Sequence, residues 1–208
     1  MGPSIASRSR RCPWRSAGRA FLSDREGAAA VEFTIVAVPF LGLCAAIIQV
    51  AFLIWAAQNF DRALQNGVRG LLTGQFQLAR ASQSNAQSVQ DALKDQICGT
   101  GSARIPTLFR CADLKVDVTT SSNFSGSTAG TPYNAQTGTW STGFGSNYTC
   151  PKPGTIVTVT AAVEFPTFLG LLGVNLKTFA NGSHLLMSTA VFRTEPYETG
   201  GGATACGT

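Results

Sequence analysis

The sequence predicts an α+β fold in which a long N-terminal helix crosses a membrane and continues into a small exported domain with a second helix and an antiparallel sheet of about three strands. The first observation is a run without formal charge from Phe33 to Phe60, since about 20 apolar residues suffice to cross a hydrocarbon core roughly 30 Å thick. The second is the change of pattern after this run, first to apolar residues at helical spacing and later to strict alternation.

Residues 1–27 are expected to form a basic leader. Six arginines against Asp24 and Glu26 place a charge of 6 − 2 = +4 before Gly27, so only +1 of the chain's net +5 remains after it. A basic flank on one side of a span favours a cytoplasmic location for that side. We therefore expect a cytoplasmic N-terminus and a C-terminal domain outside. A nucleic-acid partner is not expected, because the domain itself carries almost no net charge.

Residues 28–57 are the predicted transmembrane helix. Trp55 suits the membrane–water interface, and Pro39 removes one backbone hydrogen bond, which membrane helices tolerate as a kink. Glu32 stands at the leading edge of the apolar run. A carboxylate carried deeper into lipid costs about 2.5–3.5 kcal/mol, so Glu32 needs a partner.

Two simpler interpretations of this stretch exist. A secretory signal peptide has an apolar region of roughly 7–15 residues followed by small residues at the cleavage site. Here the small residues Gly27 to Ala30 precede an apolar run that is longer than this. An uncleaved single-span anchor fits the length, but it assigns no role to Gly27 or Glu32.

Residues 58–208 are the predicted domain. The N-terminal helix should continue into it, since apolar residues recur there at helical spacing: Phe60, Leu64, Val68, Leu71 and Leu72. We expect this helix to end or bend between Thr73 and Ser82. The stretch Ser84-Asn85-Ala86-Gln87 predicts a capping box for a second helix that ends at Cys98-Gly99, with its inner face formed by Val89, Leu93 and Ile97.

The three predicted strands are residues 114–118, 157–165 and 185–192. Between the first two, residues 121–154 are rich in Ser, Thr, Gly and Asn, which indicates a long surface loop or a hairpin. Between the last two, residues 166–179 are apolar and form either a short buried helix or a segment that lies on the membrane or on a partner.

Cysteine usage agrees with export. Cys12 lies in the leader, and Cys44 in the span behaves as a small hydrophobe. An even number in an exported domain indicates disulfides, with three possible connectivities, and the four cysteines concerned are Cys98, Cys111, Cys150 and Cys206. A zinc site is disfavoured, because neither CxxC spacing nor nearby histidines accompany them.

We predict a disulfide between Cys98 and Cys111. They lie 111 − 98 = 13 positions apart and would join the end of the second helix to the start of the first strand, where a loop of about 15 residues is worth roughly 3 kcal/mol. Cys150 and Cys206 then remain as a possible second pair. The alternative pairings tie Cys98 or Cys111 to Cys150 in the polar stretch or to Cys206 in the Gly-rich tail, and both are harder to hold within the roughly 4.4–6.8 Å that two bridged Cα atoms require.

Catalytic chemistry is nearly absent. The single histidine, His184, follows Ser183 directly, and two adjacent residues do not form a catalytic triad. We expect a surface histidine there. The sequence therefore predicts a protein that is not an enzyme and that binds no cofactor or metal.

The N-terminal motif resembles a known family. A basic leader that ends in Gly27, with Glu32 as the fifth residue after it and an unbroken apolar helix, resembles prepilins and pseudopilins. The stretch from Arg25 to Phe33, followed by Pro39, more narrowly resembles the TadE-like family of the tight-adherence (Flp, type IVc) pilus system. The strand and acidic-proline stretch Ala190–Tyr197 also matches this family, whereas residues 122–150 match no motif.

This resemblance implies a pilin-like minor pilin or pseudopilin of the bacterial inner membrane, with a single pass and a periplasmic C-terminal domain. It implies that a prepilin peptidase cleaves after Gly27 and leaves Ala28 as the new N-terminus. The Glu32 carboxylate would pair with the α-amine of Ala28 on a neighbouring subunit and set the axial register; alternatively, it reaches to interfacial water. The implied partners are the peptidase, other pilins, inner-membrane pilus assembly proteins and membrane lipid.

A second function class remains open. The chain fits a single-span membrane-anchored periplasmic binding domain or enzyme unrelated to pili, with its activity between residues 122 and 150. Aromatic side chains in this polar stretch would form a binding surface or pack the loop: Tyr133, Trp140, Phe144 and Tyr148.

Overall fold

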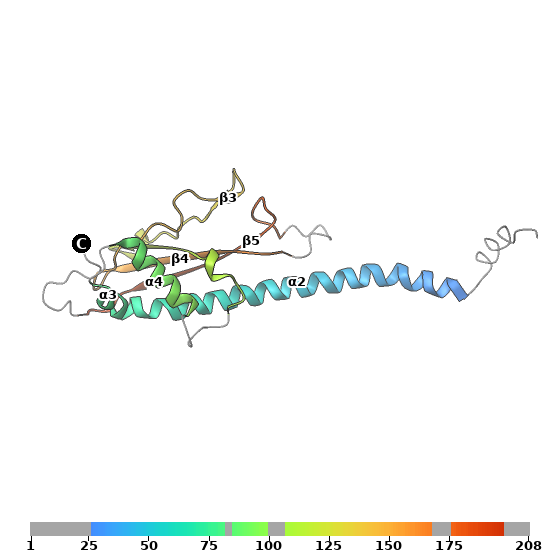
Figure 1. Cartoon of the computed structure of the whole chain (residues 1–208), viewed down its shortest axis with the longest axis horizontal. Coiled ribbons are helices and arrows are strands. Elements are labelled where there is room, and N and C mark those ends of the chain that lie inside the picture. The colour runs from blue at the N-terminus through green and yellow to red at the C-terminus, as the bar shows by residue number, and fades with distance from the viewer. Residues whose placement is uncertain (1–25, 82–84, 100–106, 168–175, 198–208) are drawn as a thin grey trace, which may run out of the picture. The chain divides into compact units, whose positions relative to one another are not determined.

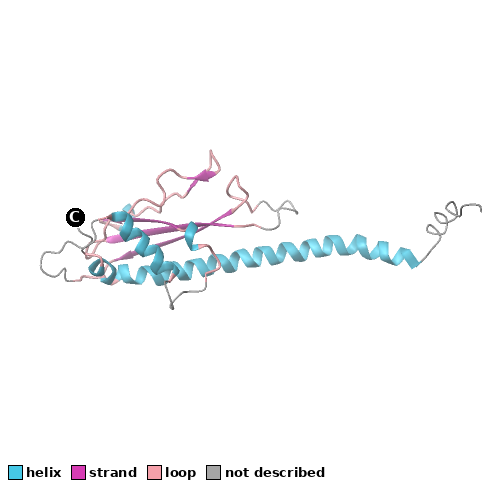
Figure 2. Ribbon diagram, in the orientation of Figure 1, coloured by secondary structure: helices cyan, strands magenta, loops and turns pink. Residues whose placement is uncertain are grey.

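The computed structural model describes residues 26–81, 85–99, 107–167 and 176–197. The chain divides into two units, residues 1–47 and residues 48–208, and the described part of the first unit is helical. The element order is a long helix, two shorter helices and then the strands, which confirms the predicted α+β class (Figures 1 and 2).

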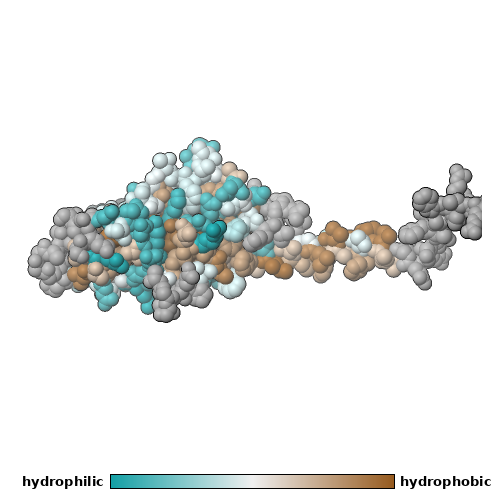
Figure 3. Space-filling model, viewed as in Figure 1, coloured by the Kyte–Doolittle hydropathy of each residue, from teal (hydrophilic) through white to brown (hydrophobic). Residues whose placement is uncertain are grey.

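Helix α2 runs from Glu26 to Leu72 and contains Pro39 in its interior. Its uncharged stretch makes it long and apolar enough, by length and composition, to cross a membrane. The apolar side chains of this stretch are visible along α2 in Figure 3. The predicted single N-terminal helix is therefore present.

Three antiparallel strands form the main sheet of the second unit. They are β1 (Lys115–Ser121), β4 (Ile156–Phe165) and β5 (His184–Arg193), in the spatial order β1-β4-β5. Val118 pairs with Val159, and Val159 pairs with Ala190. All three predicted strands are confirmed, each with its bounds shifted by a few residues.

The core lies between this sheet, the second half of α2 and helix α4 (Ala86–Cys98). Alternate residues of β4 face it with no exposed surface, and the predicted inner faces of the two helices are buried against it except at Leu72, which is half-buried. The central side chains are Phe60, Leu64, Leu71, Val89, Leu93, Ile97, Val116, Val118, Val157, Val159, Ala161 and Val163. The helical spacing read from the sequence thus selects the right buried faces.

The other face of β4 is buried as well. Thr158 and Thr160, the polar members of the alternation, are 3% and 1% exposed. The stretch between β1 and β4 covers them, and the Gly130 N–H donates to the Thr160 hydroxyl at 2.9 Å. This stretch holds a short 3₁₀ turn and the two-stranded hairpin of β2 (Tyr133–Asn134) and β3 (Thr139–Trp140).

The ends of the helices follow the predicted breaks with one correction. Helix α2 ends at Leu72, and the short α3 (Gln75–Ala79) follows Gly74, whose φ is 75°. The predicted capping box was wrong by one residue: Asn85 is the N-cap, and its side chain accepts from the Gln87 N–H. Ser and Asn cap equally well, so pattern alone does not choose between them. Ser84 lies outside the described residues.

Most of the apolar stretch 166–179 also lies outside the described residues, so neither interpretation of it is tested. Its last residue, Phe179, is buried and packs edge-on against Tyr133, with ring centroids 5.6 Å apart. This contact joins the segment before β5 to the β2–β3 hairpin.

Candidate functional site

The first candidate site is the start of α2, which carries the residues of the predicted cleavage and register motif. Gly27 and Ala28 lie in the first turn of the helix. Glu32 is exposed, and its neighbours Val31 and Phe33 are 60% and 73% exposed. Among the described residues, no hydrogen bond or ion pair links the Glu32 carboxylate to another side chain.

Exposed apolar side chains surround Glu32 on all sides of the helix. None of the apolar 18-residue window that marks the span is buried. The largest exposed side chains are Phe33, Ile35, Val36, Val38, Phe40, Leu41, Leu43, Ile47 and Ile48. Fully burying one such side chain is worth about 1.5–3 kcal/mol. This half of α2 therefore needs lipid or other helices as its surroundings, and a lone carboxylate there needs a cationic or hydrogen-bonding partner.

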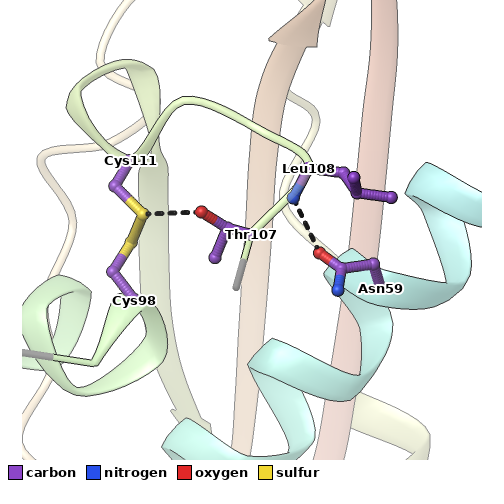
Figure 4. Close-up of a disulfide and its surroundings, with 5 residues drawn as sticks. All are labelled: Asn59, Cys98, Thr107, Leu108 and Cys111. Atoms are coloured by element: carbon purple, nitrogen blue, oxygen red, sulfur yellow. Dashed lines mark hydrogen bonds between the residues drawn. A yellow bond between two sulfur atoms is a disulfide. The ribbon is translucent and has the colours of Figure 1, made fainter. Parts of the chain in front are cut away.

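The second feature is the disulfide between Cys98 and Cys111, with its Cα atoms 6.1 Å apart (Figure 4). It ties the end of α4 to the 3₁₀ turn Cys111–Asp113 that precedes β1. Nearby, the Leu108 N–H donates to Asn59 Oδ1 at 3.0 Å, which links the same connection to α2. The predicted disulfide is thus present.

Cys150 also forms a disulfide. Cys206, with which we expected it to pair, lies outside the described residues, so that pairing stays a prediction. The thiol of Cys44 in the apolar half of α2 is free.

The C-terminal acidic-proline stretch closes the end of α2. The Glu195 N–H donates to the Leu72 carbonyl at 2.9 Å, one of the carbonyls that a helix end leaves without an internal donor. The Tyr197 ring fills the space over Gly74, where an added Cβ would lie 2.2 Å from the ring. Its hydroxyl donates to the Pro151 carbonyl at 3.0 Å. No pattern in the sequence predicts this contact.

Burial shapes the chemistry of the tyrosines near this contact. It raises the pKa of Tyr197, and burial together with the neighbouring Tyr197 raises the pKa of Tyr148. Both phenols therefore stay protonated at neutral pH. Tyr197 remains a hydrogen-bond donor to Pro151 under these conditions.

The aromatic residues of the polar stretch pack together. Trp140 stacks on Phe144 with ring centroids 6.0 Å apart and planes 9° apart, and its centroid lies 5.0 Å from that of Phe179. Lys115 Nζ lies 4.5 Å from the Trp140 centroid. Tyr148 packs against the core instead. The arrangement supports loop packing, the second of the two roles considered for these residues.

Glu164 on β4 holds this aromatic cluster in place. It accepts from Trp140 Nε1 at 2.6 Å, Asn181 Nδ2 at 2.8 Å and the Ser183 hydroxyl at 3.0 Å. Burial alone would raise its pKa, but these three donors and the Lys115 charge outweigh burial and hold the pKa of Glu164 below its usual range. An ionised carboxylate with three donors is a structural anchor rather than a general base.

A surface hollow of about 590 Å³ opens beside Trp140 and Glu164, with Lys94 and Asp113 on its rim. Lys94 already pairs with Asp91 at 3.0 Å. Within the described residues, no group of three His, Cys, Asp or Glu side chains is placed to hold a metal ion. His184 Nδ1 lies 2.5 Å from the Leu176 carbonyl, and the Ser183 hydroxyl donates to Glu164 at 3.0 Å, so each side chain is engaged with a group other than its neighbour.

The described chain thus combines one helix that is long and apolar enough to cross a membrane with a disulfide-linked α+β unit. A family model described as TadE-like protein matches residues 27–69. This match confirms the resemblance predicted from the residues, and it likens this segment of the chain to the TadE-like family. No match is found among curated proteins or solved structures.

The matched segment lies entirely within α2 and covers none of the strands. The likeness to the TadE-like family therefore concerns this helical segment. The C-terminal stretch Ala190–Tyr197 lies outside the match, so its likeness to the family stays a prediction.

Proposed function

We propose that this protein is a minor pilin or pseudopilin that supports assembly of a tight-adherence pilus. The observation that carries the proposal is the exposed apolar half of α2, in which Glu32 is the one carboxylate between Gly27 and Phe60, inside the segment that matches the TadE-like family. Such a helix is stable only among lipid chains or other helices, and Glu32 suits a site that pairs with a neighbouring subunit. The role is structural rather than enzymatic.

In this proposal, residues 1–27 are a cytoplasmic leader, residues 28–57 form the anchor in the bacterial inner membrane, and residues 58–208 form the periplasmic domain. None of the 50 − 29 + 1 = 22 residues from Ala29 to Val50 is buried, and this stretch alone reaches the roughly 20 residues needed for a span. The disulfides are typical of an oxidising compartment such as the periplasm.

Processing supplies the partner for Glu32. Cleavage after Gly27 by a prepilin peptidase would create an α-amine at Ala28, one helical turn before Glu32. On a single chain this amine and the carboxylate are four residues apart; between neighbouring helices shifted by one turn, they would meet at the same depth. A pair of this kind offsets the desolvation of both charges, and breaking a buried pair costs about 3–5 kcal/mol.

The experiment is deletion and complementation in the native bacterium. Deleting the gene should abolish surface pili, as counted by electron microscopy, and plasmid-borne wild-type protein should restore them. Normal pili in the deletion strain would contradict the proposal.

The alternative, a membrane-anchored periplasmic binding domain or enzyme, would use the hollow beside Trp140. The faces of Trp140 already contact Phe144, Phe179 and Lys115, and the Glu164 oxygens are engaged by donors. The pilus role is therefore the function that the residues support best.

A further inference from the structure

The chain contains two Asn-Gly pairs, Asn66-Gly67 and Asn181-Gly182. Asparagine is a thermolabile residue, and glycine after it favours deamidation, because a residue without a Cβ lets its main-chain nitrogen approach the preceding side-chain amide. The structure places the two pairs in opposite surroundings. They therefore differ in how much of the fold must open before they react.

The first pair lies inside α2, against α4. Gly67 is buried, and an added Cβ there would lie 2.5 Å from Ile97 Cγ1 and 2.9 Å from Ile97 Cα. Closing a ring between the Gly67 nitrogen and the Asn66 side chain takes the backbone out of helical geometry and breaks a helix hydrogen bond. Core helices open only at a free energy close to that of global unfolding, so this pair is protected.

The second pair lies in the turn before β5. Asn181 is exposed, and the φ of Gly182 is 89°, in the region that glycine adopts without strain. The Gly182 N–H donates to the Phe179 carbonyl at 3.0 Å, a bond within the turn itself. Exposed turns open locally, at a free energy far below the global value. This pair can therefore react while the core stays folded.

The Asn181 side chain is held at both ends of its amide. Its Nδ2 donates to Glu164 Oε2 at 2.8 Å, and its Oδ1 accepts from the Ser183 N–H at 3.0 Å. Hydrogen bonds to an ionised acceptor are the stronger kind. Because ring closure rotates the amide toward the Gly182 nitrogen, the bond to Glu164 must break first. The strength of that bond thus limits how often the reactive arrangement forms.

We propose that Asn181 is a modification site at which the folded chain deamidates, and that its hydrogen bond to Glu164 sets the rate. The Gly182 nitrogen gives its proton to water and attacks Asn181 Cγ; the bond from Cγ to Nδ2 then breaks, and ammonia leaves with a proton from water. Solvent water opens the resulting succinimide at either carbonyl. The products are aspartate and isoaspartate, and nothing is oxidised or reduced.

The modification alters the contacts of Glu164. It replaces a donor 2.8 Å from Glu164 Oε2 with a second carboxylate, and two carboxylates that share a site repel each other. The Glu164 carboxylate also accepts from Trp140 Nε1, so the repulsion weakens the anchor of the aromatic cluster. Deamidation would therefore loosen the packing of residues 133–144 as the protein ages.

The test is a time course on purified full-length protein in detergent at neutral pH. Trypsin releases the two pairs on separate peptides, residues 63–69 and 178–193, and mass spectrometry follows the conversion of amide to acid in each. The peptide with Asn181 should gain aspartate and isoaspartate steadily. The peptide with Asn66 should stay unmodified over the same period, since the protein supplies its own control.

Three variants test the role of Glu164. Glu164→Ala removes the acceptor and should raise the rate at Asn181 at least about fivefold. Glu164→Gln keeps a carbonyl acceptor without the charge and should raise it less. Leu64→Ala weakens the core without touching the turn and should leave the rate at Asn181 nearly unchanged. The Cys98–Cys111 disulfide, assayed on non-reducing gels, reports whether each variant folds.

The inference is wrong if Asn181 stays an amide in wild-type protein, or if Asn66 converts as fast as Asn181. An unchanged rate at Asn181 in folded Glu164→Ala also overturns it. A rise as large in Leu64→Ala as in Glu164→Ala would show that the reaction needs the core to open, against the local opening argued here. The pilus proposal does not depend on these outcomes.

Discussion

The two halves of α2 carry the same kinds of side chain in opposite surroundings. In the first half, Phe33 and Ile48 are 73% and 68% exposed, whereas Phe60 and Leu64 in the second half are 1% and 0% exposed. The second half finds its cover within the chain, under the sheet and α4. The difference shows that the chain supplies a core for the domain, while the first half of the helix is built for surroundings outside the chain.

The largest expected effect of a substitution is on processing, at the start of the exposed half of α2. Gly27→Phe should block processing completely, because a bulky residue at the scissile bond prevents the extended backbone from entering a narrow peptidase site. N-terminal sequencing of the membrane-extracted protein should find Ala28 first in the wild type and the leader in the variant. Gly18→Phe, inside the leader, is the matched control. Wild-type protein that retains its leader would refute processing.

In the covered half, Leu64→Ala should destabilise the domain by about 2–5 kcal/mol, because it leaves a cavity in the core. Ile48→Ala removes a similar side chain from the exposed half and should change stability by less than about 0.5 kcal/mol. Denaturant unfolding of both full-length variants in the same detergent, followed by near-UV circular dichroism, makes the comparison. Equal losses of unfolding free energy in the two variants would contradict the proposed difference between the two halves of α2.

The disulfide belongs entirely to the covered part. Replacing both Cys98 and Cys111 with serine should cost about 3 kcal/mol, the value for closing a loop of about 15 residues. Cys44→Ser, which changes the free thiol in the exposed half, should leave the unfolding midpoint where it is. A double variant as stable as the wild type would show that the domain does not depend on this link.

The smallest expected effect is on the pH dependence of the domain's stability. The pKa of Glu164 lies below its usual value of 4.5 in the folded protein. Glu164 therefore adds stability that is fully present above pH 4.5 and is lost as the pH falls through its lower folded pKa. The unfolding midpoint should decline slightly below that pH in the wild type. Glu164→Gln should flatten this decline, and an identical pH profile in the variant would contradict the role of the carboxylate.

Elements with strong local periodicity were predictable. The alternation along β4 and the inner face Val89, Leu93 and Ile97 of α4 were placed correctly, because a repeat of two or of about four residues directly encodes a buried face. The Cys98–Cys111 disulfide followed for a similar reason, since both cysteines flank such elements.

What escaped prediction depends on distant segments. The burial of Thr160 arises from Gly130, thirty positions away. The contact of Tyr197 with Gly74 joins the two ends of the domain; the only local signal for it was a glycine directly after a helix end, which also occurs without a covering ring. The place of β5 beside β4 depends on strand order and register, which alternation alone does not set.

The proposed pairing of Glu32 with a neighbouring subunit is tested most directly by changing this residue in the exposed half of α2. Glu32→Gln removes the charge at nearly constant shape, and Glu26→Gln does the same in the segment that cleavage would remove. We expect both variants to insert and to be cleaved after Gly27. Only Glu32→Gln should lower copurification with the other pilus subunits, by at least about tenfold given the cost of breaking a buried charge pair. Equal copurification of Glu32→Gln and wild-type protein would contradict the proposed pairing.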